Sequence, residues 1–255
     1  MPLSRKSYER AVYAGAALAG RSYLGRQLKR MYGASRKRRK RAIRSYVPRA
    51  MISGFPKQKV VSFRYSKQIT LNPSTGSVAN HLFVANGPYA PDLTGSSTRQ
   101  PLWWDTWSTV YKRYTVLGSR IRVIYTPIGS SNPGGTVGIQ LQKSSTANPY
   151  TNIDTYFESK FTKLGIIAGN QSTNLLSYKN SVRHKMSTRK FFGVSNVKDN
   201  DTLAAIMTNA NPTEKCYFNV FYLAHDATSD PLTANFRVVI DYICHLSDPL
   251  LTDES

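Results

Sequence analysis

The sequence has little acidic charge, few cysteines and no long apolar run. Against 35 Lys and Arg residues it has 14 Asp and Glu, so the 255-residue chain carries a formal net charge of +21. Only Cys216 and Cys244 occur, which argues against a disulfide scaffold, and we expect two buried free thiols rather than a bridge. No run of eighteen apolar residues exists, so we expect no insertion into a membrane.

The sequence also lacks a recognisable catalytic or metal-binding constellation. The glycine-rich residues 129–135 have no Lys-Ser/Thr pair of a phosphate-binding loop. The four histidines fall in separate predicted strands or at their ends, and none has a Cys or His partner at zinc-ligand spacing; they are His81, His184, His225 and His245. We therefore expect a protein that is not an enzyme, with no cofactor and no metal.

What the sequence has in abundance is positive charge, concentrated towards the N-terminus. Residues 1–49 hold fifteen Lys or Arg and one acid, a net charge of +14, and residues 36–44 place seven cations in nine positions. Like charges at this density repel one another and oppose compaction unless a polyanion neutralises them. Nucleic acid is the expected polyanion, because each neutralised phosphate releases a counterion.

We predict that residues 1–49 are a basic N-terminal arm that binds nucleic acid through its phosphates, with little base specificity. The densest part of the arm also fits a basic nuclear-import sequence, formed by Arg36, Lys37, Arg38, Arg39, Lys40 and Arg41. The candidate nucleic-acid-binding residues of the arm are these six together with Arg44 and Arg49.

The remaining residues, 50–255, have the patterns of β-structure and form the second predicted domain. Apolar and polar residues alternate from Val61 to Leu71, and again over residues 136–143 and 235–246. We expect further strands at residues 79–85, 116–126, 181–191, 202–208 and 217–225, a loop at 165–174, and two short helices, at 101–114 and 153–160. About eight short strands between turn-rich connections predict an all-β antiparallel sandwich or jelly roll.

One predicted strand has a basic face. Arg183, Lys185 and Arg189 share one parity in residues 181–191, whereas apolar residues such as Val182 have the other. A solvated strand face and a nucleic-acid contact explain this pattern equally well. Arg183, Lys185 and Arg189 are therefore kept as candidate nucleic-acid-binding residues.

Two parts of the chain resemble the capsid proteins of circular single-stranded DNA viruses, the circoviruses and their relatives. One is the stretch from Trp104 to Val123, where aromatic residues lead into the sequence Val-Leu-Gly-Ser-Arg-Ile; the other is the basic arm. The resemblance implies a single eight-stranded jelly roll of two four-stranded sheets. It also implies sixty copies in a T=1 icosahedral shell, with the arm directed inward onto packaged DNA.

The sequence thus favours a viral coat protein that packages circular single-stranded DNA and is found in the virion and the host nucleus. The expected partners are further copies of the chain, the DNA genome, the host nuclear-import machinery, and an anionic glycan or another host receptor. Two alternatives stay open: the capsid protein of a small or satellite single-stranded RNA virus, and a non-viral β-sandwich that binds nucleic acid or glycans.

Overall fold

The computed structural model of the chain describes six stretches: residues 55–95, 99–126, 134–147, 153–168, 181–224 and 233–250. The predicted arm, residues 1–49, lies outside them. The roles predicted for the arm and the predicted boundary at residue 50 therefore stay predictions.

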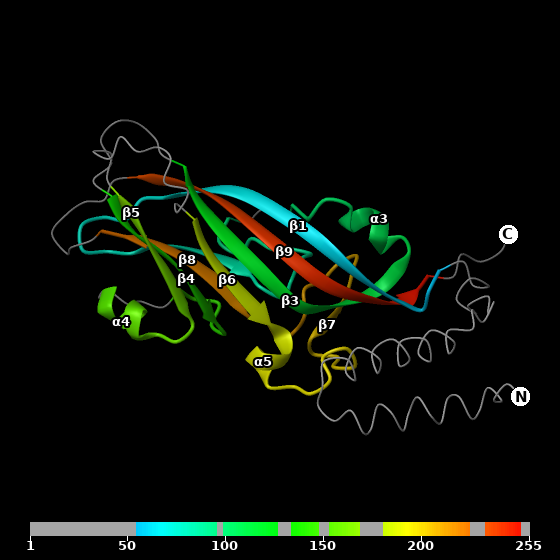
Figure 1. Ribbon diagram of the computed structural model, residues 1–255. Helices are drawn as coiled ribbons and strands as arrows, with labels where there is room; N and C mark the ends of the chain where they lie inside the picture. Colours follow the sequence, from blue (N-terminus) through cyan, green and yellow to red (C-terminus); the bar gives the residue numbers. More distant parts are fainter. Residues whose placement is uncertain are drawn as a thin grey trace, which may run out of the picture. The chain divides into compact units, whose positions relative to one another are not determined.

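Within the described residues, nine strands form two antiparallel sheets (Figure 1). The order of the first sheet is β1-β9-β3-β6, with the short strand β7 beside β3, and that of the second is β2-β8-β4-β5. In chain order the strands are β1 (Gln58–Leu71), β2 (Ala79–Val84), β3 (Tyr111–Thr126), β4 (Gly134–Gln142), β5 (Thr162–Ala168), β6 (Ser181–Ser187), β7 (Ala204–Ile206), β8 (Tyr217–Leu223) and β9 (Ala234–Pro249). The fold is the predicted jelly roll: eight strands in two four-stranded sheets, to which β7 adds a ninth.

The core lies between the two sheets and follows the predicted alternation. Every second residue of β9, from Phe236 to Leu246, has no exposed surface. Phe63 and Tyr65 of β1 belong to the same core, as do Phe218 and Val220 of β8 in the opposite sheet. The residues between them along each strand therefore point to the outer faces of the two sheets.

The described residues contain three short helices, one more than predicted: α3 (Trp104–Ser108), α4 (Ile153–Glu158) and α5 (Thr188–Phe192). The helix predicted over residues 101–114 is too long, because Tyr111 already pairs with Pro249 of β9. The strand predicted over residues 181–191 is also too long, since it ends at Ser187 and α5 follows.

Residues 165–168 form a strand where a loop was predicted. Gly165 suggested a turn, but it lies in the middle of β5 and pairs with Val137 of β4. A Cβ atom added to Gly165 would lie 2.5 Å from Cγ2 of Val182 on β6. The glycine therefore permits close packing of two strands rather than a change of chain direction.

Strand β3 contains a β-bulge that changes the alternation of its side chains. The register against β9 shifts between Val116 and Gly118, so Leu117 has no partner in the ladder. Before the bulge Val116 is buried, and after it Ile121 is buried while Arg120 is exposed. The bulge therefore determines that the arginines of β3 lie on the outer face of the sheet.

The two outer faces of the sandwich differ. On the second sheet, the rings of Tyr156 in α4 and Phe221 in β8 stack with centroids 4.0 Å apart, and Ala147 packs against a small buried cluster around Leu82. All nine residues of β4, in the same sheet, are buried. The outer face of the first sheet is instead largely exposed, as the burial patterns of β1, β3 and β6 show.

Both cysteines are free and buried. Burial raises the pKa of the Cys216 thiol to about 12 and that of Cys244 further still. Neither thiol is therefore ionised near neutral pH. No described helix has the length and apolar character needed to cross a membrane.

Candidate nucleic-acid interface

The exposed outer face of the first sheet is strongly basic. Where β1, β9, β3 and β6 pair side by side, strand parity directs six Lys or Arg side chains and one carboxylate, Asp241, to the outside. The six cations are Arg64, Arg120, Arg122, Arg183, Lys185 and Arg237. This face therefore carries a net charge of +5 on four neighbouring strands.

The strand register aligns these charges into rows. Arg64, Asp241, Arg120 and Lys185 lie directly opposite one another across β1, β9, β3 and β6. Neighbouring strands lie about 4.8 Å apart, so this row spans roughly 14 Å. A second row, two residues along each strand, places Arg122 opposite Arg183.

Two of the six cations have a partner among the described residues. Arg64 donates two hydrogen bonds to the Asp241 carboxylate, from Nε at 2.6 Å and from Nη2 at 3.2 Å, and this hydrogen-bonded carboxylate raises the pKa of Arg64. Arg237 Nη2 donates to Gln68 Oε1 at 3.3 Å. The carboxylate of the face is therefore already engaged by the cation at the β1 edge.

The other four cations form no ion pair with any described residue. We call them the cationic quartet: Arg120, Arg122, Arg183 and Lys185. Arg120 faces Lys185 and Arg122 faces Arg183 across the β3–β6 ladder. Like charges directly opposite on neighbouring strands are destabilising, so a bound anion would relieve the repulsion within both pairs.

The quartet only partly coincides with the candidates from the sequence. Arg183 and Lys185 are brought together, but Arg189 lies in α5 rather than on the strand, so the parity assigned to it is wrong. Arg120 and Arg122 lie within the strand predicted at residues 116–126. What the sequence does not reveal is that this strand pairs with β6. The eight arm candidates lie outside the described residues.

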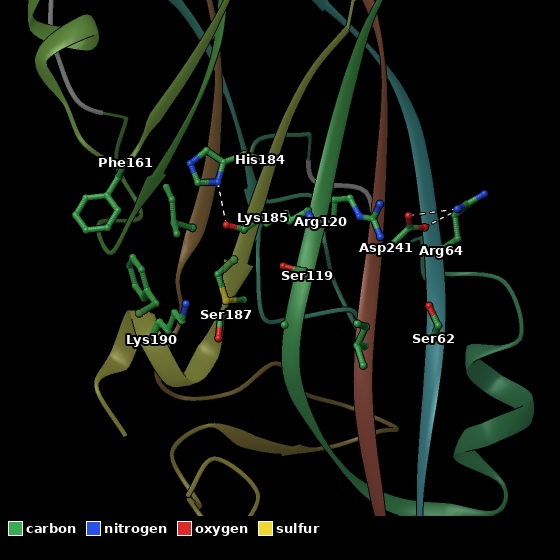
Figure 2. A pocket seen from close by; sticks show the side chains of 15 residues that line it. Ser62, Arg64, Ser119, Arg120, Phe161, His184, Lys185, Ser187, Lys190 and Asp241 are labelled. Carbon is green, nitrogen blue, oxygen red and sulfur yellow. Dashed lines mark hydrogen bonds and ion pairs between the residues drawn. The ribbon is translucent and has the colours of Figure 1, made fainter. Parts of the chain in front are cut away.

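A groove of about 770 Å³ begins on the same basic face and extends over the β6 edge (Figure 2). Its lining includes Arg64, Arg120 and Lys185 from the aligned row. Figure 2 shows Arg64 and Asp241 at one end, and Phe161 and Lys190 at the other, beyond β6. The groove therefore joins a charged strip to an aromatic end.

His184 lines the groove beside the quartet but adds no charge to it near neutral pH. Its Nδ1 lies 3.0 Å from the backbone carbonyl oxygen of Lys185. Burial lowers the pKa of the imidazole, so the ring is neutral near pH 7 and can donate its Nδ1–H to that carbonyl. The positive charge of the groove therefore comes from Lys and Arg alone.

A second cluster of charged groups is internal. Asp92, whose side chain has no exposed surface, accepts hydrogen bonds from Lys67 Nζ, from the Gly95 amide at 2.9 Å and from His81 Nε2 at 2.7 Å. It ties the segment after β2 to β1 and β2. Its burial indicates a structural role, and the described residues include no group of three or more His, Cys, Asp or Glu that could hold a metal ion.

No protein-family model matches the sequence, and no curated protein is similar to it. Among solved structures, the chain is similar to viral capsid proteins. The 60-mer BFDV capsid protein gives a TM-score of 0.44 at 8% identity, over 78% of this chain and 97% of that chain. The structure of Cocksfoot mottle virus gives a TM-score of 0.42 at 13% identity, over 74% of this chain and 97% of that chain. The structure of Mud crab tombus-like virus gives a TM-score of 0.42 at 12% identity, over 76% of this chain and 92% of that chain. At these values the likeness is one of general fold alone.

Proposed function

We propose that this chain is a viral coat protein that assembles with copies of itself into a T=1 shell and packages circular single-stranded DNA. The observation that carries the proposal is the cationic quartet, two directly opposed like-charge pairs on the bare face of a jelly roll. The same chain has an N-terminal segment of net charge +14. Two separate concentrations of unneutralised charge are best explained by a long polyanion.

Residues 1–49 and the quartet would bind the nucleic acid in different ways. Residues 1–49 would neutralise many phosphates without fixed geometry, since Lys and Arg contacts to phosphate carry no sequence information. The quartet is held at defined spacing by a β-ladder and would position a short part of the same strand. Low base specificity is expected from both, as suits a protein that covers a whole genome.

Self-association is supported by apolar side chains that a single chain leaves exposed. Leu102 and Trp103 precede α3 and are 74% and 67% exposed. Trp103 is moreover in the left-handed backbone region, with φ of 68°. An exposed tryptophan in a strained backbone conformation is more readily explained as a contact for another copy than as a feature of an isolated domain.

The remaining parts of the proposal concern the infected cell. Arg36 to Arg41 would bind the host nuclear-import machinery, because a genome copied in the nucleus must meet its coat protein there. The protein would thus occur in the virion and in the host nucleus. Contacts with an anionic glycan or another host receptor would come from the outer surface of the shell.

The test is assembly of the purified full-length chain with equal masses of circular single-stranded DNA, single-stranded RNA or duplex DNA. Electron microscopy should show uniform closed shells with the single-stranded circle, and nuclease should not digest the enclosed strand. Shells with RNA alone would favour the RNA-virus alternative. A protein that stays monomeric with every nucleic acid would contradict the assignment as a coat protein.

A further inference from the structure

The aromatic end of the groove combines an exposed ring with nearby cations. Phe161 is 51% exposed and its ring meets that of Phe191 edge-on, with centroids 6.4 Å apart. Lys190 of α5 is exposed and lines the same groove. A large apolar ring that remains half exposed beside a lysine is a surface suited to a ligand that is both planar and anionic.

The backbone that carries the Phe161 ring is held in place by the sheet. Phe161 comes directly before β5, its carbonyl oxygen accepts a hydrogen bond from the Leu141 amide at 3.0 Å, and the next amide, that of Thr162, donates to Ser159 at 3.2 Å. Phe191, its neighbour, packs against the main core. The backbone at Phe161 is therefore ordered before any ligand arrives, and the ring has an edge contact with Phe191, which lowers the entropy lost on binding.

The charge in the groove selects an anion. Four of its lining residues are cationic, namely Arg64, Arg120, Lys185 and Lys190, and Asp241 is the acid among those that line it. Asp241 is hydrogen-bonded to Arg64 at the end away from Phe161 (Figure 2). The part beyond Arg120, towards Phe161, therefore holds Lys185 and Lys190, neither of which forms an ion pair with a described residue.

We infer that this groove is a nucleotide-binding subsite for single-stranded nucleic acid, in which Arg120, Lys185 and Lys190 bind phosphate and Phe161 stacks on a base. The inference rests on the proposed function and gives it a fixed point of contact outside the arm. A simple inorganic anion would leave the ring unused. A duplex keeps its bases inside its own stack, so an unpaired strand is the nucleic acid that can use both halves of the groove.

The test uses the full-length chain and a short oligothymidylate. Ultraviolet light cross-links a stacked thymine to the aromatic ring beside it, and peptide mapping then locates the adduct. We expect an adduct on the peptide that contains Phe161, and its loss in the variant Phe161→Leu. Phe157→Leu is the matched control, since Phe157 is 58% exposed in α4 but does not line the groove; the adduct at Phe161 should persist in it.

Binding measurements give a second readout. Phe161→Leu should weaken oligothymidylate binding about fivefold without changing its salt dependence, because base stacking involves no counterion release. Lys190→Gln should instead reduce the slope of log K against log salt by about 0.7. Circular dichroism should be the same for all variants.

The outcomes separate the inference from the proposed function. If the oligonucleotide binds and cross-links elsewhere in the chain but never at Phe161, the subsite is refuted while the packaging function stands. An unchanged salt slope in Lys190→Gln would remove that lysine from the subsite even if Phe161→Leu failed to fold. Failure of the unaltered chain to bind any single strand would overturn the proposed function itself.

Discussion

At the scale of single residues, Asp92 is a buried charge that joins β1, β2 and the segment after β2. Burial raises the pKa of its carboxyl, but hydrogen bonds from Lys67, the Gly95 amide and His81 outweigh burial and hold that pKa below its usual value. Asp92 therefore stays ionised in the folded chain. The stability it contributes is present at neutral pH and is lost only in strong acid, as pH falls through its lowered pKa.

Replacing Asp92 tests this role. We expect Asp92→Asn to lower the free energy of unfolding by about 3 kcal/mol, because it leaves the Lys67 ammonium, only 24% exposed, without a counterion. Asp241→Asn is the matched control, since its partner Arg64 is 72% exposed; it should cost less than about 1 kcal/mol. Urea denaturation of both variants measures the difference, and equal losses would contradict the argument.

The described histidines predict how stability depends on pH. Burial lowers the pKa of His81, His184 and His245. Below the ordinary value of about 6.5, the unfolded chain therefore takes up protons that the folded chain does not. Stability should fall as pH is lowered from about 7 towards 5. Urea midpoints across this range should show a smaller fall in His184→Gln, whereas stability that rises on acidification would refute the lowered pKa values.

At the scale of secondary-structure elements, the sheets were predictable where one face is buried. Alternation located β1 and β9 with every boundary within three residues. The helix before β3 was overextended because Tyr111 and Tyr114 are both buried three positions apart, a spacing that helices share with an irregular strand. The strand β5 was missed because a glycine in the sequence can indicate either a turn or close packing against a neighbouring strand. Gly165 serves the second purpose, and the sequence does not distinguish the two.

The candidate site was predictable only in part, because it depends on which strands pair with one another. Parity within one strand singled out Arg183 and Lys185, and both lie on the basic face. The addition of Arg120 and Arg122 depends on the β3–β6 pairing, which no local pattern encodes. Phe161 is brought to the groove by the closure of the two sheets, and nothing in its sequence neighbourhood marks it.

Close packing on the covered sheet gives an element-scale prediction. A Cβ atom added to Gly138 of β4 would lie 2.2 Å from Cζ of Phe221 and 2.7 Å from Cδ2 of Leu164. We expect Gly138→Ala to destabilise the protein by about 1–3 kcal/mol through overpacking. The double variant with Phe221→Leu should lose less than the sum of the two single losses, as measured by a thermodynamic cycle. Additive losses would show that the Phe221 ring is not the obstacle.

At the scale of the whole molecule, the fold and the arm should be separable. The core of the described residues extends from Phe63 to Leu246. We expect deletion of residues 1–49 to leave a β-rich protein by circular dichroism that has lost most of its nucleic acid, judged by the 260/280 nm absorbance ratio. If the truncated protein retains nucleic acid at the full-length level, the quartet becomes the principal packaging element.

The quartet can be tested in the complete chain. Neutralising Arg120, Arg122, Arg183 and Lys185 to Gln should raise the free energy of unfolding at low salt, because two opposed like-charge pairs disappear. The same change should weaken binding of a single strand and reduce its salt slope. Arg113, which pairs with Asp201 and Asp248, offers a control position on β3; Arg113→Gln should not stabilise the protein. A quartet variant of lower stability would show that the cations do not repel one another.

Nuclear import is a prediction about the arm alone. A fluorescent protein fused to residues 1–49 should accumulate in the nucleus, because Arg36 to Arg41 match a basic import sequence. Replacing these six residues by Gln should return the fusion to the cytoplasm. A fusion that is cytoplasmic from the outset would leave the run with a packaging role only.

The unpaired Leu117 shifts the alternation of all later side chains in β3 by one position. Upstream of it one parity faces the core, and downstream the other does, so Ile121 points inward and Arg120 outward. If Leu117 instead paired with Ile243, the ladder would be unbroken, but every later residue of β3 would shift by one position against β9 and change sides. Arg120 and Arg122 would then face the apolar core, and Ile121 would face water. The bulge at Leu117, rather than any residue that carries charge, thus decides on which side of the sheet the arginines of β3 lie, and deletion of Leu117, which leaves Ile121 opposite Ile240, should preserve that arrangement.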